Sequence, residues 1–163
     1  MYILKEHSRF FQDGLFMRLF YLWCCLIVVN THAYAFSCYL TIAKDNCWKD
    51  YAVTVRAIDT HNNQQVAEIM IPKGKSWGRV PFKCDTGQVF LLNAQFSPAM
   101  WKDEDSKMYA LKSYLSLPKN IKAGEAAWNL TACYANDFAG LPLPNGATNN
   151  CQCDLSQIEK PVI

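Results

Sequence analysis

The sequence predicts an all-β protein, a single domain built as an antiparallel β-sandwich and braced by disulfide bonds. Three observations lead to this fold class. Apolar and polar residues alternate along several short segments, turn residues separate these segments, and an even number of cysteines follows an N-terminal export signal. Alternation with a period of two is typical of half-buried strands, whereas an amphipathic helix repeats every 3.6 residues.

Residues 1–35 are predicted to be a signal peptide that is cleaved after Ala35. Arg18 provides a short basic region, residues 19–29 are continuously apolar, and Ala33-Tyr34-Ala35 offers the small residues that signal peptidase accepts. The apolar stretch is shorter than the roughly 20 residues of a membrane-spanning helix. An uncleaved anchor is the alternative. Because the pattern opens at Met17, that residue is a second candidate for the true start.

The remaining chain, residues 36–163, has the length of one domain with one core. We expect a β-sandwich over residues 36–135 and a tail over residues 136–163 that is rich in Pro, Gly and Asn. The net charge of this part is close to zero, so nothing in it indicates nucleic acid or an anionic membrane as partner. The membrane is expected to matter only transiently, during export to a secreted or periplasmic location.

The first three strands are predicted over residues 36–43, 51–59 and 66–72. Each alternates apolar and polar positions, and each is followed by a polar turn that contains Asn or Gly. Such clusters are typical of connections between strands. Residues 98–111 are expected to be a loop, and short strands are expected over residues 113–117 and 126–134.

The segment from Ser76 to Ser97 is predicted to be a central hairpin. Its first strand directs Val80, Phe82 and Cys84 to one face, and the turn Asp85-Thr86-Gly87 joins it to a second strand. That second strand directs four apolar residues inward, namely Phe90, Leu92, Ala94 and Phe96. In such a turn Asp bonds the backbone and Gly tolerates a positive φ.

These strands favour a sandwich with immunoglobulin-like architecture, which is an analogy of architecture and carries no function. A partly open β-barrel is the alternative. In the last predicted strand Trp128 and Leu130 point inward and Asn129 points outward. Asn129-Leu130-Thr131 is a glycosylation sequon, which matters only if the host modifies exported chains.

Six cysteines remain after signal-peptide removal and are predicted to form three disulfides: Cys38, Cys47, Cys84, Cys133, Cys151 and Cys153. Six cysteines allow 15 pairings. A bridge between Cys151 and Cys153 would close a small strained ring, so each tail cysteine is expected to reach a different body cysteine. Assuming that the first strands run antiparallel in order, we prefer Cys38–Cys84. Cys47 and Cys133 then take Cys151 and Cys153 in an order that stays open.

The same cysteines could serve two other chemistries. Cys151-x-Cys153 with two more thiolates could hold Zn²⁺ or Cu⁺, but the chain has no C-x-x-C pair with nearby histidines. A reactive C-x-C pair could take part in thiol–disulfide exchange. The chain, however, lacks the thioredoxin-like C-x-x-C motif at the start of a helix. Structural disulfides are therefore expected, with no metal and no cofactor. The acidic run of residues 103–105 lacks the spacing and the Gly of a calcium loop.

No catalytic residue is predicted, and the protein is not expected to be an enzyme. His61 is the only histidine after residue 35 and falls in a polar turn, and the chain has no G-x-S-x-G elbow. Glu68, Glu125 and Asp137 could contribute to acid–base chemistry but are expected to be surface charges.

Aromatic residues are the feature that could carry recognition. Trp48, Trp77 and Trp101 are expected in loops or at strand edges, where an indole can stack on a sugar or anchor a protein. Met100 and Tyr109 accompany Trp101 in the most plausible contact patch. For each Trp taken singly, we favour the interpretation that it closes one end of the core. The expected function is therefore a non-catalytic binding or structural module with an unknown protein or glycan partner, and the alternatives are a carbohydrate-binding module or a thiol–disulfide exchange protein.

Overall fold

The computed structural model describes residues 36–102, 105–148 and 150–159. The predicted signal peptide and its cleavage site lie outside these residues. The described chain contains eight strands and one short 3₁₀ helix, in the order β1 (Phe36–Lys44), η1 (Asn46–Trp48), β2 (Ala52–Asp59), β3 (Gln65–Ile71), β4 (Trp77–Cys84), β5 (Val89–Ser97), β6 (Tyr109–Ala110), β7 (Leu115–Ser116) and β8 (Ala127–Tyr134). The predicted all-β class is confirmed.

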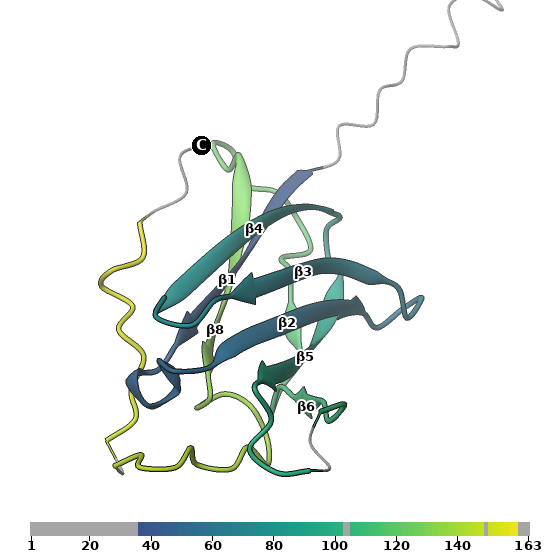
Figure 1. Cartoon of the computed structure of the whole chain (residues 1–163). Helices are drawn as coiled ribbons and strands as arrows, with labels where there is room; N and C mark the ends of the chain where they lie inside the picture. The colour runs from purple at the N-terminus through teal and green to yellow at the C-terminus, as the bar shows by residue number, and fades with distance from the viewer. Residues whose placement is uncertain (1–35, 103–104, 149, 160–163) are drawn as a thin grey trace, which may run out of the picture. The chain divides into compact units, whose positions relative to one another are not determined.

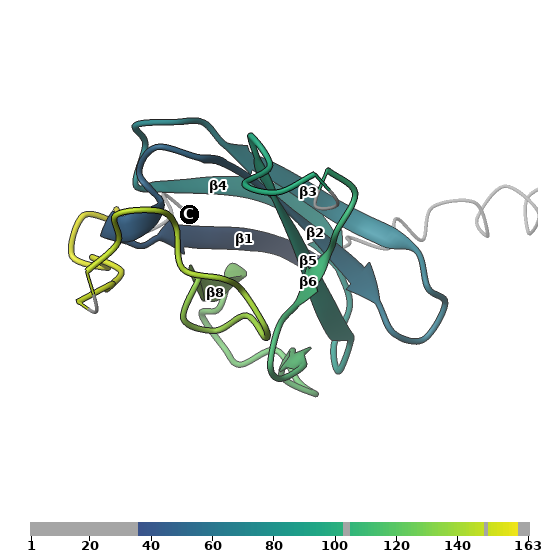
Figure 2. The same cartoon turned by 60° about the horizontal axis from the view of Figure 1, so that its bottom comes forward.

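The strands form two sheets, which Figure 1 shows in one view and Figure 2 in a second. The first sheet has the order β4-β1-β8, and the second has the order β3-β2-β5-β6 with β7 also paired to β5. Both sheets contribute to a single hydrophobic core. Its largest fully buried side chains come from η1 and from strands of both sheets: Trp48, Tyr134, Phe90, Leu40, Ile42, Ile71, Leu92, Val53 and Val55.

The sheets are not antiparallel throughout, which corrects the prediction. β1 pairs antiparallel with β4 but parallel with β8, with Cys38 opposite Trp128 and Ala43 opposite Cys133. A parallel pair needs a long crossover between its strands. Here β2 to β7 provide that crossover, since all of them lie between β1 and β8 in the chain.

The predicted hairpin over Ser76–Ser97 is wrong in its pairing, although both of its strands exist. β4 belongs to the three-stranded sheet and β5 to the five-stranded sheet. The turn with Gly87 at φ 73° therefore carries the chain from one sheet to the other. The inward alternation holds in both strands, since Phe82, Cys84 and the four apolar residues of β5 are buried.

Three disulfides link the described cysteines: Cys38–Cys84, Cys47–Cys151 and Cys133–Cys153. The preferred bridge Cys38–Cys84 is confirmed, but the strand trace behind it was not correct. β1 pairs directly with β4, which sets Phe36 opposite Cys84 and Cys38 opposite Phe82. The two cysteines are therefore diagonal neighbours on the inner face, with their Cα atoms 5.9 Å apart.

The C-terminal segment, described over residues 144–148 and 150–159, contains no strand among these residues and is joined to the body by the other two bridges. Cys151 joins it to η1, and Cys153 joins it to the end of β8. Figures 1 and 2 both show this yellow segment beside η1 at the end of β1. The expected fastening of the tail to the body by two bridges is confirmed, and the structure assigns the order that the sequence left open.

Candidate functional site

A shallow hollow of about 820 Å³ lies beside β4 and contains one of the predicted tryptophans. We call it the Trp77 groove. It is lined by nine residues of β1, β3, β4 and the turn between β3 and β4: Tyr39, Met70, Pro72, Lys75, Ser76, Trp77, Gly78, Arg79 and Pro81.

Strand geometry explains why these side chains meet. In β4 the odd positions Trp77, Arg79 and Pro81 face away from the core, and antiparallel pairing sets Pro81 opposite Tyr39. Gly78 faces inward, and a Cβ added there would lie 2.9 Å from Ile69 Cδ1 of β3. The missing side chain therefore lets β3 approach β4, and the outer surfaces of the two strands become continuous.

Arg79 is the fixed cation of the groove. Its guanidinium carbon lies 5.5 Å from the ring centre of Trp77 and 6.0 Å from that of Tyr39, within the range of cation–π contacts. Its Nε donates to Thr41 Oγ1 at 2.8 Å, and its Nη2 donates to the carbonyl oxygen of Glu159 at 2.7 Å. A guanidinium carries five N–H donors, so three remain for a ligand.

Met70 adds an apolar edge to the groove. It lies in β3, its side chain points outward, and 66 % of its surface is exposed. A large flexible apolar side chain at this exposure provides contact area to a partner and stabilises nothing in the core. The groove thus combines aromatic rings, an exposed thioether and an oriented cation.

Two members of the candidate surface, Trp48 and Tyr109, are buried, so their place in that surface is wrong, and Trp48 instead fills the core as the favoured interpretation expects. Trp48 is fully buried and contacts the rings of Tyr51, Phe96 and Tyr134. Tyr109 is 3 % exposed and stacks on Phe96. Trp48 follows the N-cap Asp45, and this cap turns the chain so that the indole enters the core.

Trp101 is half exposed, and its neighbour Met100 packs partly against the core. Both lie in the loop between β5 and β6 of the five-stranded sheet, whereas Trp77 begins β4 of the other sheet. The structure therefore does not assemble the five predicted residues into one surface. Sequence reasoning missed Tyr39, Arg79 and Met70. The alternation along each strand predicts that these side chains point outward. It does not predict that β1 pairs with β4, which brings them together.

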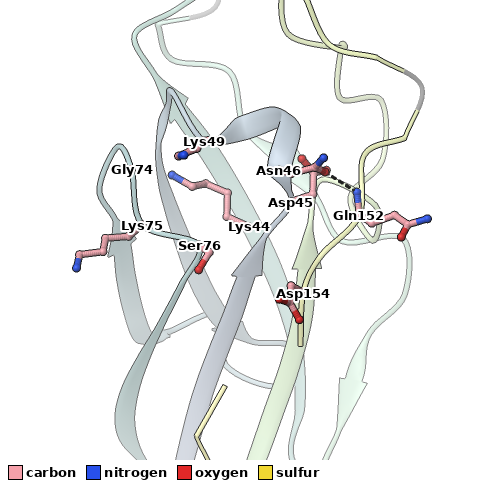
Figure 3. A pocket seen from close by; sticks show the side chains of 9 residues that line it. All are labelled: Lys44, Asp45, Asn46, Lys49, Gly74, Lys75, Ser76, Gln152 and Asp154. Carbon is pink, nitrogen blue, oxygen red and sulfur yellow. Dashed lines mark hydrogen bonds between the residues drawn. The ribbon is translucent and has the colours of Figure 1, made fainter. Parts of the chain in front are cut away.

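A second hollow of about 340 Å³ adjoins the first and shares Lys75 and Ser76 with it. We call it the lysine cavity, and Figure 3 shows its lining. Nine residues surround it: Lys44, Asp45, Asn46, Lys49, Gly74, Lys75, Ser76, Gln152 and Asp154. Lys44 is 2 % exposed, and burial lowers the pKa of its ammonium group, an effect that the nearby Asp50 opposes.

The cysteines of the tail do not pair with one another. Cys151 and Cys153 bond to Cys47 and Cys133, so the C-x-C sequence is part of two separate bridges. Among the described residues, Asp45, Cys47 and Cys151 form a group with the spacing of metal ligands. Their ligand atoms are already used, because the two sulfurs are bonded together and Asp45 accepts hydrogen bonds from the backbone amides of Cys47, Trp48 and Ala135.

The titratable residues considered for catalysis are dispersed. His61 is exposed in the turn between β2 and β3, and Glu68 forms an ion pair with Arg56 at 2.6 Å. Glu125 accepts from the backbone N–H of Lys122 and from Trp128 Nε1, and the first of these bonds chiefly lowers its pKa. Asp137 accepts from the backbone N–H of Cys133. Each carboxylate thus has a local structural partner. Asp103 and Glu104 lie outside the described residues.

No protein-family model, curated protein or solved structure matches this chain. The described residues also contain no helix with the length and apolar character needed to cross a bilayer. Asn129 is exposed, as predicted, and its side chain bonds Thr41 and Thr131. The molecule is a disulfide-rich β protein.

Proposed function

We propose that this protein is an exported, non-catalytic binding module that holds a saccharide ligand in the Trp77 groove. The observation that carries the proposal is Arg79, which two hydrogen bonds and two aromatic rings hold in one orientation beside exposed apolar surface. Small-ligand sites typically combine apolar walls with a few oriented polar groups.

The size of the groove favours a saccharide over a protein partner. Nine residues line it, whereas a stable protein interface involves about 20–30 residues on each side. An indole beside a cation offers a flat apolar face for the C–H side of a sugar and hydrogen-bond donors for its hydroxyl groups. A protein that buries a much larger area around Met70 is the competing outcome of the test below.

Export is supported by two independent features. Three intramolecular disulfides indicate an oxidising compartment, where such bonds form and persist. Residues 17–35 carry the signal-peptide pattern. N-terminal sequencing of protein recovered from the periplasm or the medium should begin at Phe36. A product that begins at Met1 or Met17 would contradict cleavage after Ala35.

The proposal extends to the architecture. We infer an immunoglobulin-like β-sandwich, because two sheets share one core and β1 lies between an antiparallel and a parallel neighbour in its sheet. An experimental structure in which the sheets close into a continuous barrel would overturn this inference.

The binding test uses neutral and acidic oligosaccharides as immobilised probes, with the oxidised protein in solution. We expect at least one probe to bind, and Trp77→Ala to weaken that binding by about tenfold or more, since central aromatic anchors commonly contribute over about 1.4 kcal/mol. Trp101→Ala is the matched control, because it removes an exposed indole outside the groove. Binding to no probe, or equal losses in both variants, would argue against the proposed function.

A further inference from the structure

The lysine cavity is enclosed by four parts of the chain that are far apart in sequence. Its walls come from the end of β1, from η1 and the residue after it, from the turn before β4, and from the C-terminal segment. Asn46 Oδ1 accepts from the backbone N–H of Gln152, which attaches the C-terminal wall to η1, as the dashed line in Figure 3 marks. The Cys47–Cys151 bridge holds the same two walls together covalently.

Lys44 provides a buried cation in this cavity. Its Nζ donates to the carbonyl oxygens of Tyr51 at 2.6 Å and Pro72 at 3.0 Å. An ammonium group has three N–H donors, so one remains after these two bonds. Lys49 lines the same cavity, as Figure 3 shows. Like charges that line one cavity repel, and an anion bound between them would reduce this repulsion.

The acidic residues in the wall do not neutralise these lysines. Asp45 is engaged by three backbone amides, and Asp154 Oδ1 accepts from the backbone N–H and the hydroxyl of Ser156. The ion pairs found among the described residues are Arg56–Glu68 and Lys73–Asp50, and neither includes a lysine of the cavity. Asp50 favours the charged form of Lys44 but forms its ion pair with Lys73, so none of Lys44, Lys49 and Lys75 forms an ion pair with a carboxylate in the described part of the chain.

We propose that the lysine cavity binds an anionic group, a carboxylate, sulfate or phosphate, through Lys44, Lys49 and Lys75. The hydroxyl of Ser76 lies in the same wall and can donate to an oxyanion. The cavity shares Lys75 and Ser76 with the Trp77 groove, so one ligand can occupy both hollows. The ligand of the groove is then an acidic saccharide, and this last step rests on the proposed function.

The anion site is tested on the oxidised protein by ¹H–¹⁵N NMR titration with inorganic phosphate, sulfate and glucuronate, with NaCl keeping the ionic strength constant. We expect saturable shifts of the backbone amides of Lys44, Gly74 and Ser76 with at least one probe. The double variant Lys49→Gln/Lys75→Gln should bind about tenfold more weakly, because each exposed ammonium contributes a few-fold to affinity.

Lys83→Gln is the matched control, since Lys83 is an exposed lysine of β4 that lines neither the cavity nor the groove. It should bind the anion as tightly as the unchanged protein does. Shifts that fail to saturate with all three probes, or an equal loss of affinity in Lys83→Gln, would show that only general charge attraction operates and would overturn the site.

The link to the groove is tested with an acidic oligosaccharide and its carboxyl-reduced neutral form. We expect the acidic form to bind more tightly, and Lys49→Gln/Lys75→Gln to abolish that preference while Trp77→Ala weakens both forms. Equal binding of both forms would overturn the acidic-ligand inference and leave the saccharide groove in place. Saturable phosphate binding without binding of either saccharide would preserve the anion site and overturn the groove.

Discussion

Trp48 illustrates how one residue outside the strands controls the end of the core. Asp45 caps η1 by accepting the backbone N–H groups of Cys47 and Trp48, and a third amide, that of Ala135, binds its other oxygen. The indole that follows contacts the rings of Tyr51 and Phe96 at centroid distances of 5.2 and 4.8 Å. A buried carboxylate thus orders the turn that places the largest core side chain.

Replacing Trp48 with Ala should lower the free energy of unfolding by about 3–5 kcal/mol, since truncating a buried Trp removes its contacts and leaves a cavity. Denaturant unfolding followed by circular dichroism measures this change. Trp101→Ala should stay within about 0.5 kcal/mol, because half of that side chain is exposed. Similar losses for the two variants would contradict the assignment of Trp48 to the core.

Lys44 should titrate below its ordinary pKa of 10.5, because burial disfavours the charged form more than Asp50 favours it. Between the lowered pKa and 10.5, the unfolded chain binds more protons at this residue than the folded chain does. Its contribution to the free energy of unfolding therefore rises as the pH rises through that window.

NMR titration of the Lys44 ¹³Cε signal gives the folded pKa directly. The difference in unfolding free energy between the unchanged protein and Lys44→Met should grow in favour of the unchanged protein as the pH approaches 10.5. A midpoint at or above 10.5 would contradict the effect of burial.

At the scale of elements, the C-terminal segment acts as a strap across the outer face of the three-stranded sheet. Thr41 and Ala43 of β1 point to that face and are nevertheless fully buried. Cys153, bonded to Cys133, lies with its sulfur 3.5 Å from the carbonyl oxygen of Ala43, and Glu159 accepts a hydrogen bond from Arg79. The strap therefore also positions the cation of the Trp77 groove.

Breaking the Cys133–Cys153 bridge with the double variant Cys133→Ser/Cys153→Ser should lower the free energy of unfolding by about 2–4 kcal/mol. The bridge closes a loop across a sequence separation of 20, and this constraint is lost. Residues beyond Cys151 should also become accessible to limited proteolysis, which mass spectrometry detects. Leu155→Ala, an exposed position of the same segment, serves as the control and should change neither property. An unchanged cleavage pattern in the double cysteine variant would show that the strap is held by other contacts.

At the scale of the whole molecule, the three disulfides connect the main elements. One bridge joins β1 to β4 within a sheet, one joins η1 to the tail, and one joins β8 to the tail. Four chain connections cross between the sheets, namely β1 to β2, β3 to β4, β4 to β5 and β7 to β8. The covalent links therefore lie around the three-stranded sheet, whose edge strand forms the groove.

Full reduction should unfold the protein or leave it marginally stable. Each bridge contributes about 2–4 kcal/mol, and their total is similar to the 5–15 kcal/mol of a typical domain. The measurement is the urea midpoint with and without reductant, and the thiols are counted by mass after alkylation. The oxidised chain from residue 36 onward should contain no free thiol. An unchanged midpoint after complete reduction would contradict a structural role for the bridges.

Much of the fold could be predicted from local patterns. The period of two along residues 51–59 or 89–97 follows from a strand with one buried face, because successive side chains point to opposite sides. The six bridged cysteines followed from their number and from the export signal. For the candidate site, Trp77 was identified from the sequence. Trp48 and Tyr109 were candidates for a binding surface, but both side chains are buried.

By itself, the sequence determined where the long strands lie, which of their residues face the core and which cysteines are oxidised, since these depend on neighbours in the chain and on the compartment. The short strand β6 (Tyr109–Ala110) lies within residues 98–111, where a loop was predicted, because only its pairing with β5 makes it a strand. Only the tertiary structure decided that β4 pairs with β1 rather than β5, and that β8 lies parallel to β1. Strand pairing joins residues distant in sequence and is selected by the free energy of the whole packed core. The groove and the lysine cavity both arise from that choice, because each is assembled from segments that meet only after the sheets have formed.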